Sequence, residues 1–250
     1  PIVLQAGDII GGCYKLGALI GKGGMGVVYK ANHISLNRQI ALKFIAPSMV
    51  STDSWELFKR EAKLNSTLSH PSVCQIYDLG IHAGALPFYA MDYIEGQTLE
   101  DVLLLNGPLS LGATLELFIK IAGGISYAHR KNIVHKDIKP ANIMLTKSPS
   151  GIPDIRLLDF GIAELSDGLN QNNKGTTQTI IGSAAYMSPE QFLGLNGELR
   201  SDIYSIGCTI FETLTNLTPF QGESFSDLQK LHTKQEAPLL SEVTGMYFPL

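Results

Sequence analysis

The pattern of hydrophobic and polar positions changes from alternation to helical spacing near Thr98. Before that point, YKLGALIGKGGMGVVYKANH alternates on either side of a glycine cluster, and RQIALKFIA, SVCQIYDLGIH and LPFYAMDYIEG are further strand-like runs. One helical pattern, STDSWELFKREAKLNSTLSH, interrupts the strands and ends before Pro71. The first part of the chain is therefore predicted to form a sheet with one main helix.

From Thr98 onward the pattern predicts helices. The run LSLGATLELFIKIAGGISYAHRKN is long and periodic, and SDIYSIGCTIFETLTN is apolar almost all round, which predicts a buried helix. The short runs PANIMLT and DIRLLDFG lie between them. We predict an α+β chain whose strand-rich lobe, residues 14–91, is joined through residues 92–96 to a helical lobe, residues 97–250.

Composition and charge argue against several classes of protein. The 250 residues are 44% hydrophobic and 17% charged, with a formal net charge of -4; this indicates a globular core and gives no support to nucleic-acid binding. The three cysteines are scattered, which argues against a disulfide framework or a zinc site.

No apolar run of transmembrane length and no secretory pattern is found, so we expect a cytoplasmic segment without membrane contact. Because the chain begins at Pro1, we expect a longer parent, which could carry an anchor elsewhere.

The glycine cluster extends from Gly21 to Val28, with glycine at positions 21, 23, 24 and 26. Glycines at such spacing let backbone N–H groups approach phosphate oxygens. A Rossmann fingerprint would need a helix directly after the glycines, and a Walker A loop would need Lys and Ser or Thr, but Val27 and Val28 stand there. A glycine hairpin between two strands remains, either as a phosphate-binding turn or as a plain tight turn.

Two charged residues interrupt apolar patterns. Alternation in IALKFI places Lys43 on an apolar strand face, and Glu61 falls within a helical stripe made of Leu57, Leu64 and Leu68. Buried charges are normally partnered, so we predict that Lys43 and Glu61 form an ion pair. The alternatives are that one of the two side chains reaches solvent, or that the pair is purely structural.

The stretch IVHKDIKPANIML concentrates polar residues between apolar ones. A carboxylate such as Asp137 can accept or orient the proton of a substrate hydroxyl, and Lys139 can balance charge on a transferring phosphoryl group. The carboxamide of Asn142 can bind magnesium, and Asp159 in LLDFG is a second candidate ligand. The alternative is a polar loop whose Asp and Asn cap backbone groups.

These motifs, in this order and followed by Ser188-Pro189-Glu190, resemble the eukaryotic-type (Hanks-type) protein kinase family, and specifically its bacterial serine/threonine branch. The resemblance extends from about Tyr14 to Phe220. It implies a two-lobed kinase fold, with a small antiparallel sheet and one main helix in the first lobe and a larger, mostly helical second lobe. It also implies transfer of the γ-phosphate of ATP to Ser or Thr hydroxyls of proteins, the chain itself included.

The resemblance assigns roles to the matching positions. Asp137 would be the catalytic base, Lys139 the phosphate-facing lysine, and Lys43, paired with Glu61, would hold the phosphates. Asn142 and Asp159 would bind Mg²⁺, with Mn²⁺ as the alternative, and Asp202 matches the buried aspartate of the central helix. The ATP contacts implied by the resemblance are Ile20, Gly21, Lys22, Gly23, Gly24, Met25, Gly26, Val27, Val28, Ala41, Lys43, Met91, Asp92, Ile94 and Met144.

Two details indicate the substrate class. Lys139 lies two residues after Asp137, and Gly182-Ser183 stands where Ser/Thr kinases carry a hydroxyl residue that contacts the catalytic Asp and Lys. Small-molecule kinases share the H-x-D-x-x-x-x-N loop but typically lack the following segment with its Thr-rich middle. A pseudokinase that scaffolds partners without turnover is the alternative from another class.

The sequence departs from the family pattern at several positions. Lys136 replaces the arginine of H-R-D, which puts control by phosphorylation at Thr176, Thr177 or Thr179 in question, because Lys offers only a point charge to a phosphate. Asn65 is polar where relatives carry a small or apolar residue. The chain stops at Leu250 before the family's last helices, so Glu190 is expected to lack its family partner. We expect a fragment of the domain; the alternative is that another chain supplies the missing packing. The apolar surface left behind would favour aggregation or pairing, for example as a homodimer.

Overall fold

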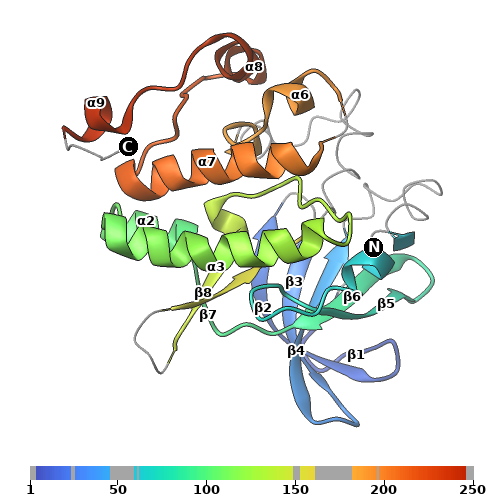
Figure 1. Ribbon diagram of the computed structural model, residues 1–250. Helices are drawn as coiled ribbons and strands as arrows, with labels where there is room; N and C mark the ends of the chain where they lie inside the picture. Colours follow the sequence, from blue (N-terminus) through green and yellow to red (C-terminus); the bar gives the residue numbers. More distant parts are fainter. Residues whose placement is uncertain are drawn as a thin grey trace. The chain divides into compact units, whose positions relative to one another are not determined.

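The structure, a computed structural model, describes residues 4–23, 26–45, 59–60, 62–148, 153–160, 182–195 and 197–245. Its Cα positions divide into two compact units (Figure 1). The strand unit holds the described residues of 1–70 and 74–95, and the helical unit holds those of 71–73, 96–160 and 182–245. The boundary between Glu95 and Gly96 lies inside the segment predicted to join two lobes.

The strand unit is built on a six-stranded antiparallel sheet in the order β1-β2-β3-β4-β6-β5. Its strands are β1 (Ile9–Ile10), β2 (Tyr14–Gly23), β3 (Gly26–His33), β4 (Arg38–Ile45), β5 (Ile76–His82) and β6 (Leu86–Asp92). On β4, Ile40, Leu42 and Phe44 enter one core cluster together with Phe88 of β6. The alternate residues of β4, among them Lys43, point to the other face, as the period-two pattern predicts.

Little of the predicted main helix belongs to the described residues. Residues 59–60 and 62–65 are helical, and the N–H of Ser66 donates to the carbonyl of Ala62 over 2.9 Å. Asn65 is buried at the end of this helical stretch, and its carbonyl accepts from Leu68 N over 3.0 Å. Glu61 lies outside the described residues.

The helical unit contains a three-stranded sheet and its helices. The sheet pairs β7 (Gly96–Thr98), β8 (Ile143–Thr146) and β9 (Asp154–Leu157) in that order. The helices are α2 (Leu99–Asn106), α3 (Leu111–His129), the 3₁₀ helix η2 (Pro140–Asn142), α6 (Pro189–Phe192), α7 (Leu199–Thr215), α8 (Phe225–Lys234) and α9 (Leu240–Thr244). The change of pattern predicted near Thr98 is confirmed, because Thr98 caps α2 in a reciprocal pair of hydrogen bonds with Asp101.

One segment before the unit boundary belongs to the helical unit. Residues 71–73 precede β5 in the chain, yet Val73 bridges Leu157 in parallel and Ser72 O accepts from Leu157 N over 2.9 Å. Ser72 also contacts the position where a Cβ on Gly124 would stand, at 3.1 Å. This segment therefore departs from the continuous lobe of residues 14–91 that the sequence pattern predicts.

Helix α3 contradicts the expectation that no apolar run of the chain reaches transmembrane length. Its 19 residues have a mean hydropathy of 1.2 over the best 18-residue window, so by length and composition alone it could cross a membrane. A buried core helix meets the same criterion. Helix α3 packs against α7 and β9, and buries Leu117, Ile121 and Ile125 (Figure 1). We therefore interpret it as a core helix.

Helix α7 differs from the prediction of a helix buried all round. Ile203 is 62% exposed, whereas Ser205, Thr209 and Thr213 are buried. Each of these hydroxyls donates to the carbonyl four residues earlier, over 3.1, 2.7 and 2.7 Å. The hydroxyls of Thr209 and Thr213 bond to the backbone of their own helix, and the Ser205 hydroxyl also lies 2.8 Å from the carbonyl oxygen of Tyr186. Small polar residues can therefore face the protein interior.

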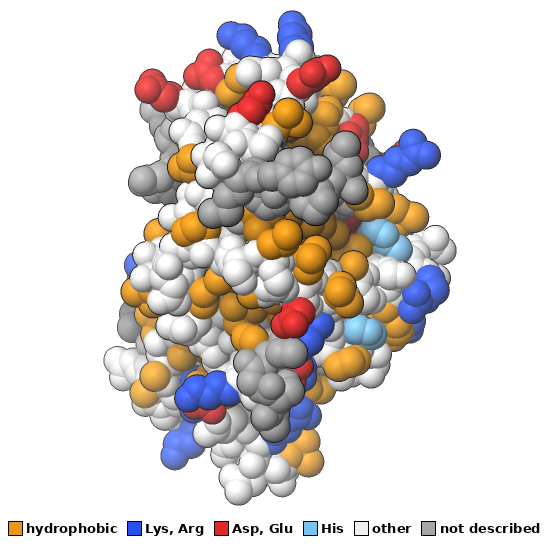
Figure 2. Space-filling view, turned by 60° about the vertical axis from the view of Figure 1, so that its left-hand side comes forward, with side chains coloured by type: hydrophobic (Ala, Val, Ile, Leu, Met, Phe, Trp, Pro, Cys, Tyr) orange, Lys and Arg blue, Asp and Glu red, His pale blue; other side chains and the backbone are white. Residues whose placement is uncertain are grey.

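Charged side chains of both signs mix on the visible surface. On the face shown in Figure 2, Lys and Arg stand among Asp and Glu, and the coloured residues form no large patch of one sign. This distribution agrees with the small net charge of -4.

Candidate active site

The loop between α3 and β8 brings Asp137, Lys139 and Asn142 together. Lys139 Nζ donates to Asp137 Oδ1 and Oδ2 over 3.0 and 2.8 Å, and Asn142 Nδ2 donates to Asp137 O and Oδ2 over 2.7 and 2.9 Å. The side chains of Asp137 and Lys139 are 14% and 17% exposed. The carboxylate of Asp137 is therefore held from two sides and still reaches solvent.

Ser183 joins this group from a distant part of the chain. Lys139 Nζ donates to Ser183 Oγ over 2.6 Å, across 44 positions of sequence. The contact predicted for the hydroxyl of Gly182-Ser183 is thus present on the Lys139 side. A lysine bonded to a carboxylate and a hydroxyl at once places a positive charge beside both groups.

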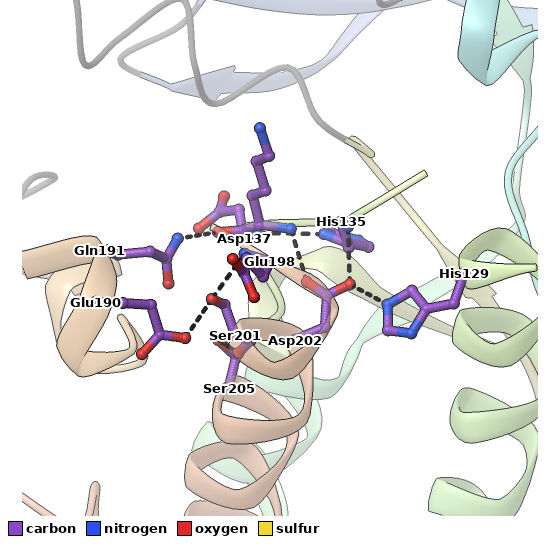
Figure 3. A network of polar contacts seen from close by, with 10 residues as sticks. His129, His135, Asp137, Glu190, Gln191, Glu198, Ser201, Asp202 and Ser205 are labelled. Atoms are coloured by element: carbon purple, nitrogen blue, oxygen red, sulfur yellow. Dashed lines mark hydrogen bonds and ion pairs between the residues drawn. The ribbon is translucent and has the colours of Figure 1, made fainter. Parts of the chain in front are cut away.

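Asp202 of α7 anchors the backbone just before Asp137 (Figure 3). The carboxylate is fully buried and accepts from His135 N over 2.9 Å and from Lys136 N over 2.8 Å. Its Oδ2 also lies 2.7 Å from Nε2 of His129 at the end of α3. The charge of a buried carboxylate is tolerated here because these donors surround it.

His135 packs at the base of the loop. Complete burial lowers the pKa of His135 below its usual value, and outweighs the carboxylates of Asp202, Asp137 and Asp159 that raise it. The neutral ring accepts at Nδ1 from the N–H of Asp137 over 3.3 Å. The centre of the His135 ring lies 4.4 Å from the centre of the Phe160 ring. This ring contact links the segment that carries Asp159 to the loop that carries Asp137.

The predicted metal ligands come from neighbouring segments. Leu158 N donates to the carbonyl of Asn142 over 2.9 Å, which ties the residue before Asp159 to Asn142. Asp159 has a φ of 54°, an uncommon conformation for a residue other than glycine. Because the side-chain nitrogen of Asn142 makes its hydrogen bonds to Asp137, the amide oxygen is the atom left to coordinate a cation. Oxygen donors of this kind suit magnesium.

The glycine cluster forms the hairpin between β2 and β3. Gly21 pairs with Val28, Lys22 with Val27 and Gly23 with Gly26. The expected strand–glycine–strand arrangement is confirmed, and no helix follows the glycines within the described residues. Gly24 and Met25 lie outside those residues. Ile20 is 46% exposed on β2.

Lys43 lies on β4, where the period-two pattern places it. It is only 7% exposed, its neighbours across the sheet are Val28 and Tyr89, and its Nζ lies 5.9 Å from the centre of the Tyr89 ring. Its buried position is as predicted. The ion pair with Glu61 stays a prediction.

The remaining predicted ATP contacts divide between the units. In the strand unit, Ala41 pairs with Met91 across β4 and β6, Asp92 ends β6, and Ile94 follows it. In the helical unit, Met144 lies in β8 opposite Arg156. Each unit thus carries its own group of predicted site residues.

Sequence reasoning missed the side chains that hold Asp92. Arg38 Nη2 donates to Asp92 Oδ1 over 3.0 Å, Tyr77 OH donates to the same oxygen, and Gln75 N donates to Oδ2 over 3.1 Å. Burial and Asp92 raise the pKa of Tyr77 to about 12. Arg38 and Tyr77 stand on separate strands, and no motif in the sequence links them.

Glu190, which was expected to lack its family partner, accepts a hydrogen bond from a serine of this chain. It is half-buried, and its Oε1 accepts from Ser201 Oγ over 2.5 Å (Figure 3). Partial burial raises the pKa of Glu190, but hydrogen bonds from Ser201, its own backbone and Ser188 outweigh that effect and lower it. The predicted phosphorylation sites Thr176, Thr177 and Thr179 lie outside the described residues.

The fold and the Asp137 loop are those of the protein kinase class. A family model described as "Protein kinase domain" matches residues 14–245, and the chain belongs to that family. Membership implies the use of ATP. The family and fold predicted from the motifs are confirmed.

The chain is similar to known bacterial kinases in both structure and sequence. The crystal structure of the Mycobacterium tuberculosis PknI kinase domain aligns with a TM-score of 0.76 at 26% identity, over 97% of this chain and 85% of that one. A probable serine/threonine-protein kinase of Streptomyces coelicolor is 39% identical over 91% of this chain and 34% of its own length. The serine/threonine-protein kinase PknB of Mycobacterium tuberculosis is 35% identical over 89% and 36%. The chain spans about a third of the length of these curated relatives.

Proposed function

We propose that this chain transfers the γ-phosphate of ATP to Ser and Thr hydroxyls of proteins, itself included, with Asp137 as the base. The single observation that carries the proposal is the group formed by Asp137, Lys139, Asn142 and Ser183, in a chain of the protein kinase family. The similarity to serine/threonine-protein kinases supports the choice of substrate hydroxyl.

The chemistry proposed for the loop follows from its hydrogen bonds. Asp137 is oriented by Lys139 and Asn142, so its carboxylate can accept the proton of an incoming hydroxyl or orient that hydroxyl. Lys139 already spans the carboxylate and Ser183 Oγ, and its charge can stabilise negative charge on the transferring group. In this proposal Lys43 positions the phosphates from the strand unit.

The proposal includes a divalent cation held by Asn142 and Asp159, magnesium in the first place and manganese as the alternative. The amide oxygen of Asn142 and the carboxylate of Asp159 are hard oxygen donors, and the bond from Leu158 N to Asn142 O keeps their segments together. The cation would neutralise phosphate charge. The residues of this chain would fix its position.

Two other functions make different predictions. A pseudokinase scaffold would bind nucleotide without turnover, although each residue that the transfer needs is present in the sequence. A small-molecule kinase would phosphorylate sugars or antibiotics in preference to proteins. The similarity to serine/threonine-protein kinases favours phosphate transfer to proteins. It argues against both a scaffold without turnover and a kinase of small molecules.

Regulation by phosphorylation at Thr176, Thr177 or Thr179 is a further part of the proposal. Lys136 stands where many relatives have an arginine that binds the phosphate of a phosphorylated loop. Lysine offers only a point charge, so it would bind that phosphate more weakly than arginine does. Alanine at all three threonines should lower activity if the loop is regulated in this way. Unchanged activity of the triple variant would exclude it.

The test is transfer of label from γ-labelled ATP with magnesium to the chain and to a generic basic protein. Asp137→Asn removes the proposed base, and Asp154→Asn is the control, since the side chain of Asp154 is exposed and pairs with Lys120. We expect label in the wild type and in the control, and its loss in Asp137→Asn. Equal labelling of all three would refute the assignment of the base.

A further inference from the structure

The residue just before Asp137 has an unusual backbone conformation. Lys136 has a φ of 68°, in the left-handed region that residues with a Cβ seldom adopt. Its N–H donates to Asp202 Oδ1 over 2.8 Å, and its carbonyl accepts from Gln191 Nε2 over 3.1 Å. The peptide groups on both sides of Lys136 are therefore held in this conformation, one by Asp202 and the other by Gln191.

The orientation of the Gln191 side chain is set by Ser188. Gln191 Oε1 accepts from the N–H of Ser188 over 2.9 Å and from its hydroxyl over 3.0 Å, and Ser188 is fully buried. The backbone N–H of Ser188 can only donate, so the oxygen of the Gln191 amide must face Ser188. The nitrogen is thereby directed at the carbonyl of Lys136.

The carbonyl of Lys136 and the N–H of Asp137 belong to one peptide group. That group is planar, so a rotation that moves the oxygen also moves the nitrogen. Gln191 holds the oxygen, and Nδ1 of His135 accepts from the nitrogen over 3.3 Å. The peptide group between Lys136 and Asp137 is therefore held by hydrogen bonds at both its oxygen and its nitrogen.

We propose that Gln191 is a positioning residue for phosphate transfer, which fixes the peptide between Lys136 and Asp137 and so the direction of the Asp137 carboxylate. The inference rests on the proposed function, in which Asp137 is the base. It also assigns a task to the residue that directly follows Ser188-Pro189-Glu190. The end of that segment would hold the catalytic loop through one side-chain amide.

The alternative is that Gln191 only caps α6. From the sequence, Ser188 followed three residues later by Gln191 is a capping box, and glutamate serves the same purpose in such boxes. Gln191→Glu separates the two roles. Its carboxylate can still accept from Ser188, but it cannot donate to Lys136, and it places negative charge against that carbonyl.

The chain offers a matched control in Gln229 of α8. Gln229 is also half-buried, and its Nε2 donates to the carbonyl of Phe192 over 2.9 Å, at the other end of α6. Gln229→Glu therefore loses one amide-to-carbonyl hydrogen bond and adds one negative charge, as Gln191→Glu does. It does not touch the Asp137 loop.

The experiment compares kcat, KM for ATP and melting temperature of the 250-residue wild type and the two variants. A displaced base should lower kcat of Gln191→Glu on the order of tenfold to a hundredfold relative to Gln229→Glu. KM for ATP and melting temperature should match those of Gln229→Glu. Equal kcat values for the two variants would overturn the inference.

A second variant covers the outcome in which Gln191→Glu does not fold. Gln191→Met keeps the length of the side chain and removes both hydrogen-bonding roles. A pure cap predicts a lower melting temperature with kcat unchanged, which would overturn the inference, whereas a positioning role predicts a lower kcat as well. If the wild type itself transfers no phosphate, the proposed function fails; if it does and only these comparisons fail, the inference alone is wrong.

Discussion

Replacing Asp202 by asparagine should destabilise the protein far more than its small change in shape suggests. The two carboxylate oxygens accept from His135 N and Lys136 N and face His129 Nε2. An asparagine has one oxygen, so its NH₂ group must face at least one buried backbone N–H. An unsatisfied buried donor costs about 1–3 kcal/mol, and the remaining bond loses the help of the charge.

Together these losses amount to about 2–4 kcal/mol, a large share of a typical stability of about 5–15 kcal/mol. For a chain of this size the melting temperature should fall on the order of 10 °C. The measurement is the unfolding of each protein in urea and by heat, monitored by far-UV circular dichroism. Lys120 and Asp154 form an exposed pair at 2.9 Å, so Asp154→Asn is the control and should lose less than about 1 kcal/mol. An Asp202→Asn protein as stable as Asp154→Asn would refute the reasoning.

Three further predictions concern the loop, the strand unit and pH. Asp137→Asn should remove most of the turnover and leave ATP binding, measured by calorimetry, close to that of the wild type. Lys43→Met should also abolish turnover, by misplacing the phosphates; turnover near that of the wild type would contradict its role. Burial lowers the pKa of His232 from 6.5 to about 4, so protons bind the unfolded chain preferentially between those values, and the free energy of unfolding should fall as the pH falls through that range. His232→Phe keeps the ring packing and should flatten this fall in urea midpoints between pH 7 and pH 5, whereas an equal fall would show that other groups cause it.

Local patterns in the sequence predicted the parts of the fold that depend on neighbouring residues. The alternation in β4 placed Lys43 opposite the core face because a strand alternates regardless of its partners. Asp137, Lys139 and Asn142 lie within six positions, so their spacing alone brought them near one another. The order of the motifs then indicated the family.

Contacts between distant segments were beyond such patterns. Gln191 and Lys136 are 55 positions apart, and Gln191 has the appearance of a helix cap. Arg38 and Tyr77 meet at Asp92 only because the sheet order brings β4 and β5 to either side of β6. On α7 the rule that buried faces are apolar failed because hydroxyls can bond to their own helix.

The bonds from His135 and Lys136 to Asp202 also bear on how the protein opens. Detaching the loop from α7 would leave a fully buried carboxylate without its backbone donors, at a cost of several kcal/mol. The loop that carries Asp137 therefore belongs to the same cooperative unit as α7. In hydrogen exchange, the amides of His135 and Lys136 would exchange as slowly as the core of that helix, so the base stays in place through every opening short of unfolding the helical unit.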